Sequence, residues 1–365
     1  MLSLSPEICK RVVQHAYYWR DVWALCSTCK AFQREAEIKL YQQLQFVDPR
    51  RVLLACDSVI HNERLALHVK CFWFNQANDR QRSVDLGRDF WTVIQKALIA
   101  MCNIDVLFLC DRSFSNSWVL DNPAIQFKLK EAKLWSVWNA PLTRFLERQT
   151  SLQTLHFVDT LDDITHQISP GALPDLRIFD GAFMVAAQLL SCPLQHLQIV
   201  IDADPDQVPL QRLGTLKKTL RSLNLLDLPE EWSTRFLRII CATLPDLRHI
   251  GIFPYPMLSV SLHRMYPNTA YVASQRHDVF RNLMGMHYLK SIELDVTKWQ
   301  PSPIVPGGQR ALASELQTYC PSIQLVTFWM ENSRVRWSYT NSSGQWQHRV
   351  DSQVYPQYSN TWYHF

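Results

Sequence analysis

The sequence predicts an α/β protein in which a short N-terminal helical unit is followed by a solenoid of helix–strand repeats. Three observations predict this fold: a strand pattern that recurs along the chain, helix-like segments ahead of several of its copies, and an N-terminus that lacks it. Of the 365 residues, 47% are hydrophobic and 19% are charged, which is typical of a folded protein. A repeat array can reach this length without one large core, because each repeat packs on its neighbours.

The recurring strand pattern is L-x-x-L-x-L, and its clearest copy is Leu220-Arg221-Ser222-Leu223-Asn224-Leu225. Because side chains alternate along a strand, the leucines face a core, while Ser222 and Asn224 are free to face solvent or a partner. Eight copies begin at apolar residues: Ile104, Leu152, Leu176, Leu194, Leu220, Leu247, Leu289 and Ile323. The shorter steps between them, 18 to 27 residues, resemble the period of leucine-rich repeats, and the longer steps leave room for insertions.

Helix-like segments accompany these strands. Apolar residues recur at helical spacing in five segments: residues 52–55, 90–101, 236–240, 279–283 and 312–316. Two further strands are expected. Residues 65–69 alternate in polarity and predict a strand in an atypical first repeat, and residues 132–135 predict one inside the longest step.

The N-terminal residues depart from the repeat and predict a separate first helix. Ser5 suits the N-cap, Pro6 the first helical position and Glu7 the first turn. Ile8 and Val12 then lie on one face of this helix.

A second helical stretch is expected from Asp21 onward. In it an apolar stripe recurs at helical spacing: Leu25, Cys29, Phe32 and Ala36. A unit of about forty residues buries little by itself. Part of this apolar surface should therefore face the first repeat or a separate protein.

These N-terminal residues resemble an F-box. The resemblance rests on four segments: Leu4-Ser5-Pro6-Glu7-Ile8, Asp21-Val22-Trp23-Ala24-Leu25, Cys29-Lys30-Ala31-Phe32 and Leu40-Tyr41. The whole chain is similar to fungal F-box proteins that carry degenerate leucine-rich repeats. This resemblance implies that the F-box docks on the Skp-type adaptor of an SCF-type cullin–RING ubiquitin ligase, while the repeats hold a target protein.

The resemblance also implies which residues bind the adaptor: Leu4, Pro6, Ile8, Leu25, Cys29 and Phe32. Docking of an apolar helical stripe into a groove is an ordinary mode of recognition. The alternative is that these residues pack onto the first repeat and recruit nothing.

Two insertions carry candidate substrate-facing aromatic residues. One follows the strand at Leu247, and the other covers residues 299–308; prolines and glycines in both predict irregular structure. Insertions in solenoids tend to gather on one face, often the binding face. The candidates are Tyr255, Tyr266, Tyr271 and Trp299. The alternative is that they fold back over the edge of the repeats.

The C-terminal residues predict a β-hairpin. Residues 335–339 and 345–349 flank Asn341-Ser342-Ser343-Gly344, a turn sequence between two strand-like runs. The tail is aromatic, with Tyr355, Tyr358, Trp362, Tyr363 and Phe365. We expect the hairpin and the tail to cap the last repeat, because a covered edge avoids unwanted strand pairing. The expected domains are an F-box at 1–45 and a repeat domain at 46–365, with the capping segment at about 329–365.

No catalytic, cofactor-binding or metal site is predicted. Cys26 and Cys29 form a C-x-x-C, but no second pair stands at zinc-finger spacing. The acidic residues at 202, 204 and 206 lack the glycine and final glutamate of a calcium loop. A net charge of +4 gives little support to nucleic-acid or membrane binding. Scattered cysteines and the lack of a signal-peptide pattern predict a cytoplasmic or nuclear protein.

The sequence thus predicts a non-catalytic substrate-recognition subunit with two partners, an adaptor that leads to a cullin and an unknown target protein. Two other classes stay open. One is a leucine-rich-repeat scaffold that binds a partner outside any ubiquitin ligase. The other is an enzyme on an α/β repeat scaffold, which a deep pocket with converging titratable groups would indicate.

Overall fold

The computed structural model describes residues 4–75, 86–158, 166–201, 210–228, 230–253, 273–297, 299–300, 302–330, 333–340, 342, 344–351 and 361–365. The chain forms two compact units, Met1–Leu176 and Arg177–Phe365, and both are mixed α/β. The junction expected after residue 45 lies within the first unit, where a helix that ends at Gln42 leads directly into a strand that begins at Gln43.

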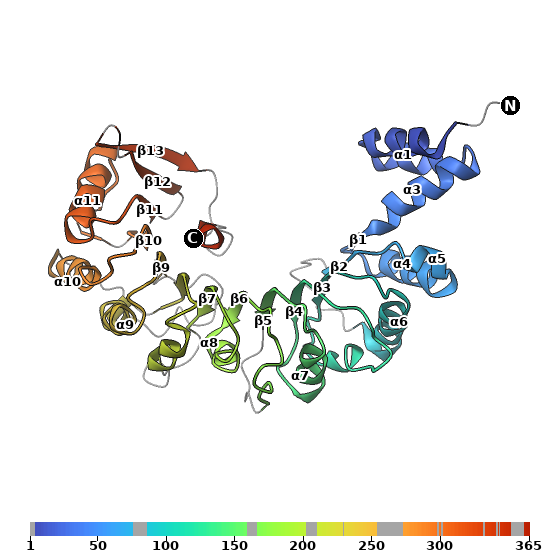
Figure 1. Cartoon of the computed structure of the whole chain (residues 1–365), viewed down its shortest axis with the longest axis horizontal. Helices are drawn as coiled ribbons and strands as arrows, with labels where there is room; N and C mark the ends of the chain where they lie inside the picture. Colours follow the sequence, from blue (N-terminus) through green and yellow to red (C-terminus); the bar gives the residue numbers. More distant parts are fainter. Residues whose placement is uncertain are drawn as a thin grey trace. The chain divides into compact units, whose positions relative to one another are not determined.

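The first unit contains parallel strands that pair in chain order. They are β1 (Gln43–Phe46), β2 (Cys71–Asn75), β3 (Val106–Cys110), β4 (Glu131–Trp135) and β5 (Thr154–Val158). Its helices are α1 (Pro6–His15), α2 (Trp19–Cys26), α3 (Lys30–Gln42), α4 (Pro49–His61), α5 (Glu63–Ala66), α6 (Gly87–Ala100), η1 (Ser117–Val119) and α7 (Ala140–Glu147). Helices α4, α6 and α7 lie on one side of these strands (Figure 1).

The second unit repeats this arrangement and ends in a hairpin. Its parallel strands are β6 (Ile178–Ala182), β7 (His196–Val200), β8 (Ser222–Leu226), β9 (His249–Phe253), β10 (Ser291–Asp295) and β11 (Leu325–Met330). Antiparallel β12 (Ser333–Thr340) and β13 (Gln345–Asp351) follow. The helices are α8 (Phe183–Ala186), η3 (Leu210–Leu216), α9 (Glu230–Thr243), α10 (Ala273–Leu283), α11 (Pro306–Tyr319) and η6 (Thr361–His364).

The strand pattern read from the sequence is confirmed at all eight positions. The middle anchor of every copy is fully buried beneath the helices: Leu107, Leu155, Phe179, Leu197, Leu223, Ile250, Ile292 and Val326. The extra strand expected at residues 132–135 is β4. The five helical segments correspond to α4, α6, α9, α10 and α11. Burial of such a side chain contributes roughly 1.5–3 kcal/mol before the entropy of ordering is subtracted, so these anchors define the core.

Among the repeats, the sequence-based expectations for residues 65–69 and 306–308 are wrong. Residues 65–69 do not form a strand, because Asn62 accepts a hydrogen bond from the N–H of Leu65 and starts the short helix α5. The strand follows as β2. Residues 306–308 are not irregular either, because Pro306 occupies the first turn of α11, where its missing N–H costs nothing.

The C-terminal hairpin is confirmed. Thr340 pairs with Gln345, and Gly344 has a φ of +63° and donates its N–H to the Thr340 carbonyl over 2.9 Å. Glycine suits this left-handed turn position because it has no Cβ. The hairpin extends β11 and so covers the edge of the last parallel strand. The described end of the tail, residues 361–365, lies elsewhere, because η6 contacts β8 and β9. Tyr355 and Tyr358 lie outside the described residues.

Candidate functional site

The N-terminal helices carry the candidate site. Helix α1 begins as predicted, with Ser5 in an extended conformation at the N-cap and Pro6 at the first helical position. The second helical stretch is two helices rather than one. Helix α2 ends at Cys26, the Thr28 hydroxyl donates to the Leu25 carbonyl over 2.8 Å, and α3 begins after an extended Cys29. The predicted continuous stripe is therefore broken between Leu25 and Cys29.

Helix α3 is the support for the other two helices, since α1 and α2 both pack on it. Lys39 of α3 donates from Nζ to the carbonyls of Val13, Gln14 and Ala16 at 2.9, 3.1 and 2.8 Å. These carbonyls lie at the end of α1, where the helix dipole makes a positive charge favourable. The Val13 carbonyl also accepts from the N–H of Ala16. One lysine thus fixes the position of α1 on α3.

A small apolar core holds the three helices together. It consists of Val13, Val22 and Ala36, each at most 2% exposed, with Leu25 and Phe32 packed partly buried against it. On the side toward the strands, Arg64 forms an ion pair with Glu37 of α3. The hydrogen bond from Arg64 lowers the pKa of the Glu37 carboxyl. The helical unit is therefore attached through α3, while α1 and α2 extend away from the strands (Figure 1).

The outward sides of α1 and α2 are unusually apolar. Seven of the seventeen exposed large hydrophobic side chains of the described residues fall in this short stretch: Leu4, Ile8, Val12, Tyr17, Tyr18, Trp19 and Trp23. Ile8 is 48% exposed and Val12 is 42% exposed, one turn apart on α1. Trp19 and Trp23 are 57% and 69% exposed, one turn apart on α2.

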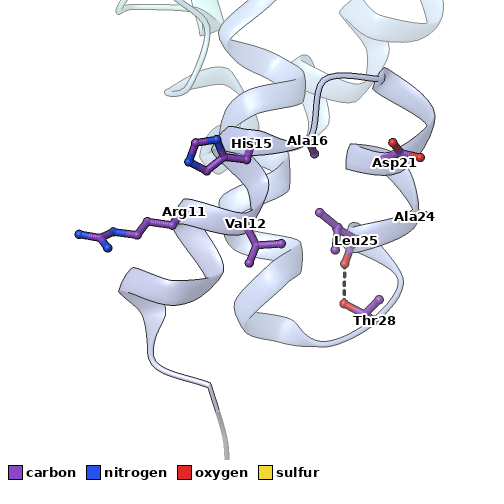
Figure 2. A pocket seen from close by; sticks show the side chains of 8 residues that line it. All are labelled: Arg11, Val12, His15, Ala16, Asp21, Ala24, Leu25 and Thr28. Atoms are coloured by element: carbon purple, nitrogen blue, oxygen red, sulfur yellow. Dashed lines mark hydrogen bonds between the residues drawn. The ribbon is translucent and has the colours of Figure 1, made fainter.

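A groove of about 580 Å³ lies between α1 and α2. Its lining residues are Arg11, Val12, His15, Ala16, Asp21, Ala24, Leu25 and Thr28. In Figure 2, Val12 from α1 and Leu25 from α2 project into the same gap, whereas Arg11 points away from it. The groove has an apolar floor with charged residues at its margin, which is the chemistry of a protein-docking surface.

The six residues expected to bind an adaptor divide into two groups. Four are exposed: Leu4, Pro6, Ile8 and Cys29. Leu25 and Phe32 instead contribute to the helical core, although Leu25 also reaches the groove. The backbone N–H of Phe32, in the first turn of α3, lowers the pKa of the exposed Cys29 thiol.

Sequence reasoning missed the exposed aromatic residues at the start of α2. Tyr17 and Tyr18 are 87% and 74% exposed and precede Trp19 directly. The signal was present in the sequence, because three consecutive aromatic residues stand where one helix ends and the next begins.

Trp299, a candidate substrate-facing residue, is not available to a partner in this structure. Its side chain is only 5% exposed, and its ring lies 6.2 Å from that of Phe280 of α10. The large apolar ring packs into the core beside α10 and is not exposed on a loop. The other three candidates, Tyr255, Tyr266 and Tyr271, lie outside the described residues.

No family model and no curated protein matches the chain. Among the helices formed by the described residues, none is long and apolar enough to cross a membrane. The candidate site therefore depends on the geometry of the N-terminal helices and on the motif resemblance alone.

Proposed function

We propose that this chain is the substrate-recognition subunit of an SCF-type cullin–RING ubiquitin ligase, with residues 1–45 as an F-box and the helix–strand units as leucine-rich repeats. The observation that supports this proposal best is the apolar surface on α1 and α2, centred on Ile8 and the groove beside Val12. A Skp-type adaptor would cover this surface and connect the chain to a cullin.

The exposure of this surface has an energetic consequence. Single exposed apolar side chains are normal on a folded protein, but a contiguous group of large ones marks an interaction site. Ile8 and Val12 do not support the helical core, because Val13, Val22 and Ala36 form it without them. Their burial therefore remains available as binding energy, at about 25 cal/mol per Å² of apolar area removed from water.

In this role the chain performs no chemistry. The adaptor side anchors it, and the repeats hold a target protein near a conjugating enzyme that the cullin recruits. Positioning alone increases the rate of transfer, because it converts an encounter between two molecules into one within a complex.

The scaffold alternative requires the N-terminal helices to be a mere cap on the first repeats. Burial of Leu4 and Ile8 against those repeats would favour it, yet these side chains are 53% and 48% exposed. We therefore favour the ligase subunit over a scaffold that binds a partner elsewhere.

The test is co-purification of the full chain with a Skp-type adaptor, with Ile8→Asp as the decisive variant. A buried aspartate at this position would weaken adaptor binding by at least about tenfold, because burying an unpaired charge costs well over 1.4 kcal/mol. Variants at Leu25 or Phe32 are unsuitable, since both side chains pack on the helical core and aspartate there would disturb folding.

Leu54→Asp is the matched control. Leu54 is also a helical apolar residue of the first unit, and it is 71% exposed on α4. We expect this variant to bind the adaptor like the unmodified chain, and both variants to unfold at the same temperature as it does. Equal adaptor binding by Ile8→Asp and Leu54→Asp, or no binding by the unmodified chain, would refute the proposal.

A further inference from the structure

The second unit carries a hydrogen-bond chain on the sheet face opposite its helices. Ser291 Oγ lies 3.0 Å from Nδ1 of His249, and Nε2 of His249 lies 3.0 Å from Oδ1 of Asn224. Asn224 Nδ2 donates to Gln198 Oε1, and Gln198 Nε2 donates to Asp180 Oδ1, each over 3.0 Å. The amide oxygen of Asn224 accepts, so the network assigns the proton of His249 to Nε2. The chain crosses five neighbouring strands, from β10 to β6.

This chain fixes the ring of His249 as a rigid platform. Both ring nitrogens are engaged, and the side chain is completely buried. Burial lowers the pKa of His249 to about 4, so the imidazole is neutral at pH 7. A neutral ring that cannot rotate offers a flat face to another aromatic ring at little entropic cost.

The tail segment (residues 361–365) is seated on this platform. The ring of Phe365 stacks on His249, with centroids 5.4 Å apart and planes 13° apart. His196 of β7 donates from Nδ1 to the carbonyl of Trp362 over 2.9 Å, and Trp362 is 1% exposed. Figure 1 shows this segment on the side of β7 to β9 that faces away from α9.

These contacts are the kind that a bound peptide makes. The tail segment pairs with no strand of the sheet. Helix η6 lies against β8 and β9, and its one printed hydrogen bond to the sheet is from His196 of β7 to the Trp362 carbonyl. The segment has two aromatic anchors three residues apart, Trp362, which carries this carbonyl, and Phe365. Aromatic anchors in desolvated sites dominate the energetics of peptide recognition.

We propose that the β7–β9 face of the second unit is a binding site for a peptide segment with two aromatic residues three positions apart, and that the tail segment occupies it as an intramolecular ligand. A partner protein gains access by displacing the tail segment. Only the identity of that partner as a ubiquitination substrate rests on the function proposed above, because peptide binding needs no adaptor.

The chemistry of the face selects such a segment. His249 is neutral, and its two direct hydrogen-bond partners, the Ser291 hydroxyl and the Asn224 amide, are neutral as well. The nearby charges of Glu293 and Arg334 are paired with each other, so the ring that stacks on His249 is favoured when it is uncharged. His196 is half-buried and supplies a single N–H for a backbone carbonyl. A partner cannot bind while the tail segment occupies the site. The apparent affinity for a partner is therefore the intrinsic affinity multiplied by the fraction of time in which the site is open.

The test measures binding of a fluorescent synthetic peptide, Thr-Trp-Tyr-His-Phe, to the full chain and to its variants. Trp362→Ala/Phe365→Ala weakens the seated tail segment without shortening the chain. We expect this variant to bind the peptide at least about tenfold more tightly than the unmodified chain. Addition of His196→Ala should reverse most of that gain, and a peptide with alanine in place of Trp and Phe should not bind.

The single variant Phe365→Ala guards against misfolding of the double variant, because Phe365 is only half-buried. It should show an intermediate gain. Peptide binding that is equal in the unmodified chain and both tail variants, or that ignores His196→Ala, would overturn the inference. Adaptor binding without peptide binding would overturn this inference and leave the proposed function intact, and the reverse result would do the opposite.

Discussion

The sheet faces opposite the helices differ sharply between the two units. In the first unit, strands β2 and β4 alternate between buried anchors and half-exposed side chains. In the second unit, β8, β9 and β10 are buried at every position. The same strand pattern therefore gives one open face and one covered face.

The chemistry of each face fits its environment. The first face carries Trp73 stacked on Phe108 at 4.8 Å, and Lys133 paired with Glu131 at 3.1 Å. Such groups tolerate water on one side. The second face carries the amides of Gln198 and Asn224, the hydroxyl of Ser291 and a neutral histidine, which hydrogen-bond to one another.

The covered face also contains a buried ion pair, between Glu293 and Arg334. Glu293 accepts from Arg334 at 3.2 Å and from the indole N–H of Trp329 at 2.8 Å, and all three side chains are at most 3% exposed. The guanidinium of Arg334 lies 4.9 Å from the centre of the Trp329 ring. A buried charge is retained when it is paired and hydrogen-bonded. Polar residues on a strand therefore form a hydrogen-bond network once another segment excludes water from them.

The largest effect is expected from Gly251→Ala on the covered face. A Cβ at this position would stand 2.2 Å from Oδ1 and 2.9 Å from Cγ of Asn224. The methyl group would displace the side chain that links His249 to Gln198. We expect a loss of about 4 kcal/mol in the free energy of unfolding, from overpacking and unsatisfied polar groups together.

Gly285→Ala provides the control, because a Cβ there meets no atom within 4 Å. Its effect should stay within about 0.5 kcal/mol by chemical denaturation. Similar losses for both variants would show that the amide network on β8 and β9 does not limit stability.

The next effect is a pH dependence that originates in His249. Burial lowers its pKa from 6.5 to about 4, so between these values the unfolded chain binds a proton that the folded chain does not. Stability from this group is complete above pH 6.5 and falls as the pH falls, by about 3 kcal/mol at pH 4. Denaturation at pH 7 and pH 4.5 measures the slope. His249→Gln should flatten it, and an unchanged slope in that variant would contradict the burial of a neutral imidazole.

A smaller effect is expected from Trp73→Ala on the open face. The half-exposed indole stacks on Phe108 with planes 23° apart. Loss of the pair should lower the free energy of unfolding by about 1 kcal/mol. A loss as large as that of Gly251→Ala would mean that the first face is covered in solution and does not differ from the second in this respect.

The smallest effect is expected from Lys133→Ala, also on the open face. Lys133 and Glu131 are 40% and 35% exposed, so solvent screens their attraction. The change should be within about 0.5 kcal/mol, and the same denaturation measurement detects it.

Much of the fold could be predicted because its signals are local. The anchors around Leu223 and Ile250 alternate with polar residues, and this alternation fixes which side chains share a face. Ser5 and Pro6 predicted the start of α1 because capping depends on neighbouring residues. The strand expected at residues 65–69 was wrong for the same reason, since Asn62 supplied a competing local signal that starts a helix.

The candidate site on α1 and α2 was predicted only in part. Leu4 and Ile8 are exposed as an adaptor-binding surface requires, whereas Phe32 packs on the helical core. Both kinds of residue lie in apolar helical stripes. Which stripe enters the core depends on how α1 and α2 pack on α3. Lys39 of α3 contributes to this packing, because it donates hydrogen bonds to carbonyls of Val13 and Ala16, more than twenty residues away.

Most strands, most helices and the hairpin follow from the sequence, because hydrogen bonding and alternation act over a few residues. Contacts between distant segments, in contrast, determine whether the polar faces are exposed or buried. Ser222 and Asn224, expected to be free for solvent or a partner, are fully buried, and His249 beside them is covered by Phe365 from the distant tail. Burial depends on contacts between segments far apart in the chain, and the pattern within one strand carries no information about which segment covers it.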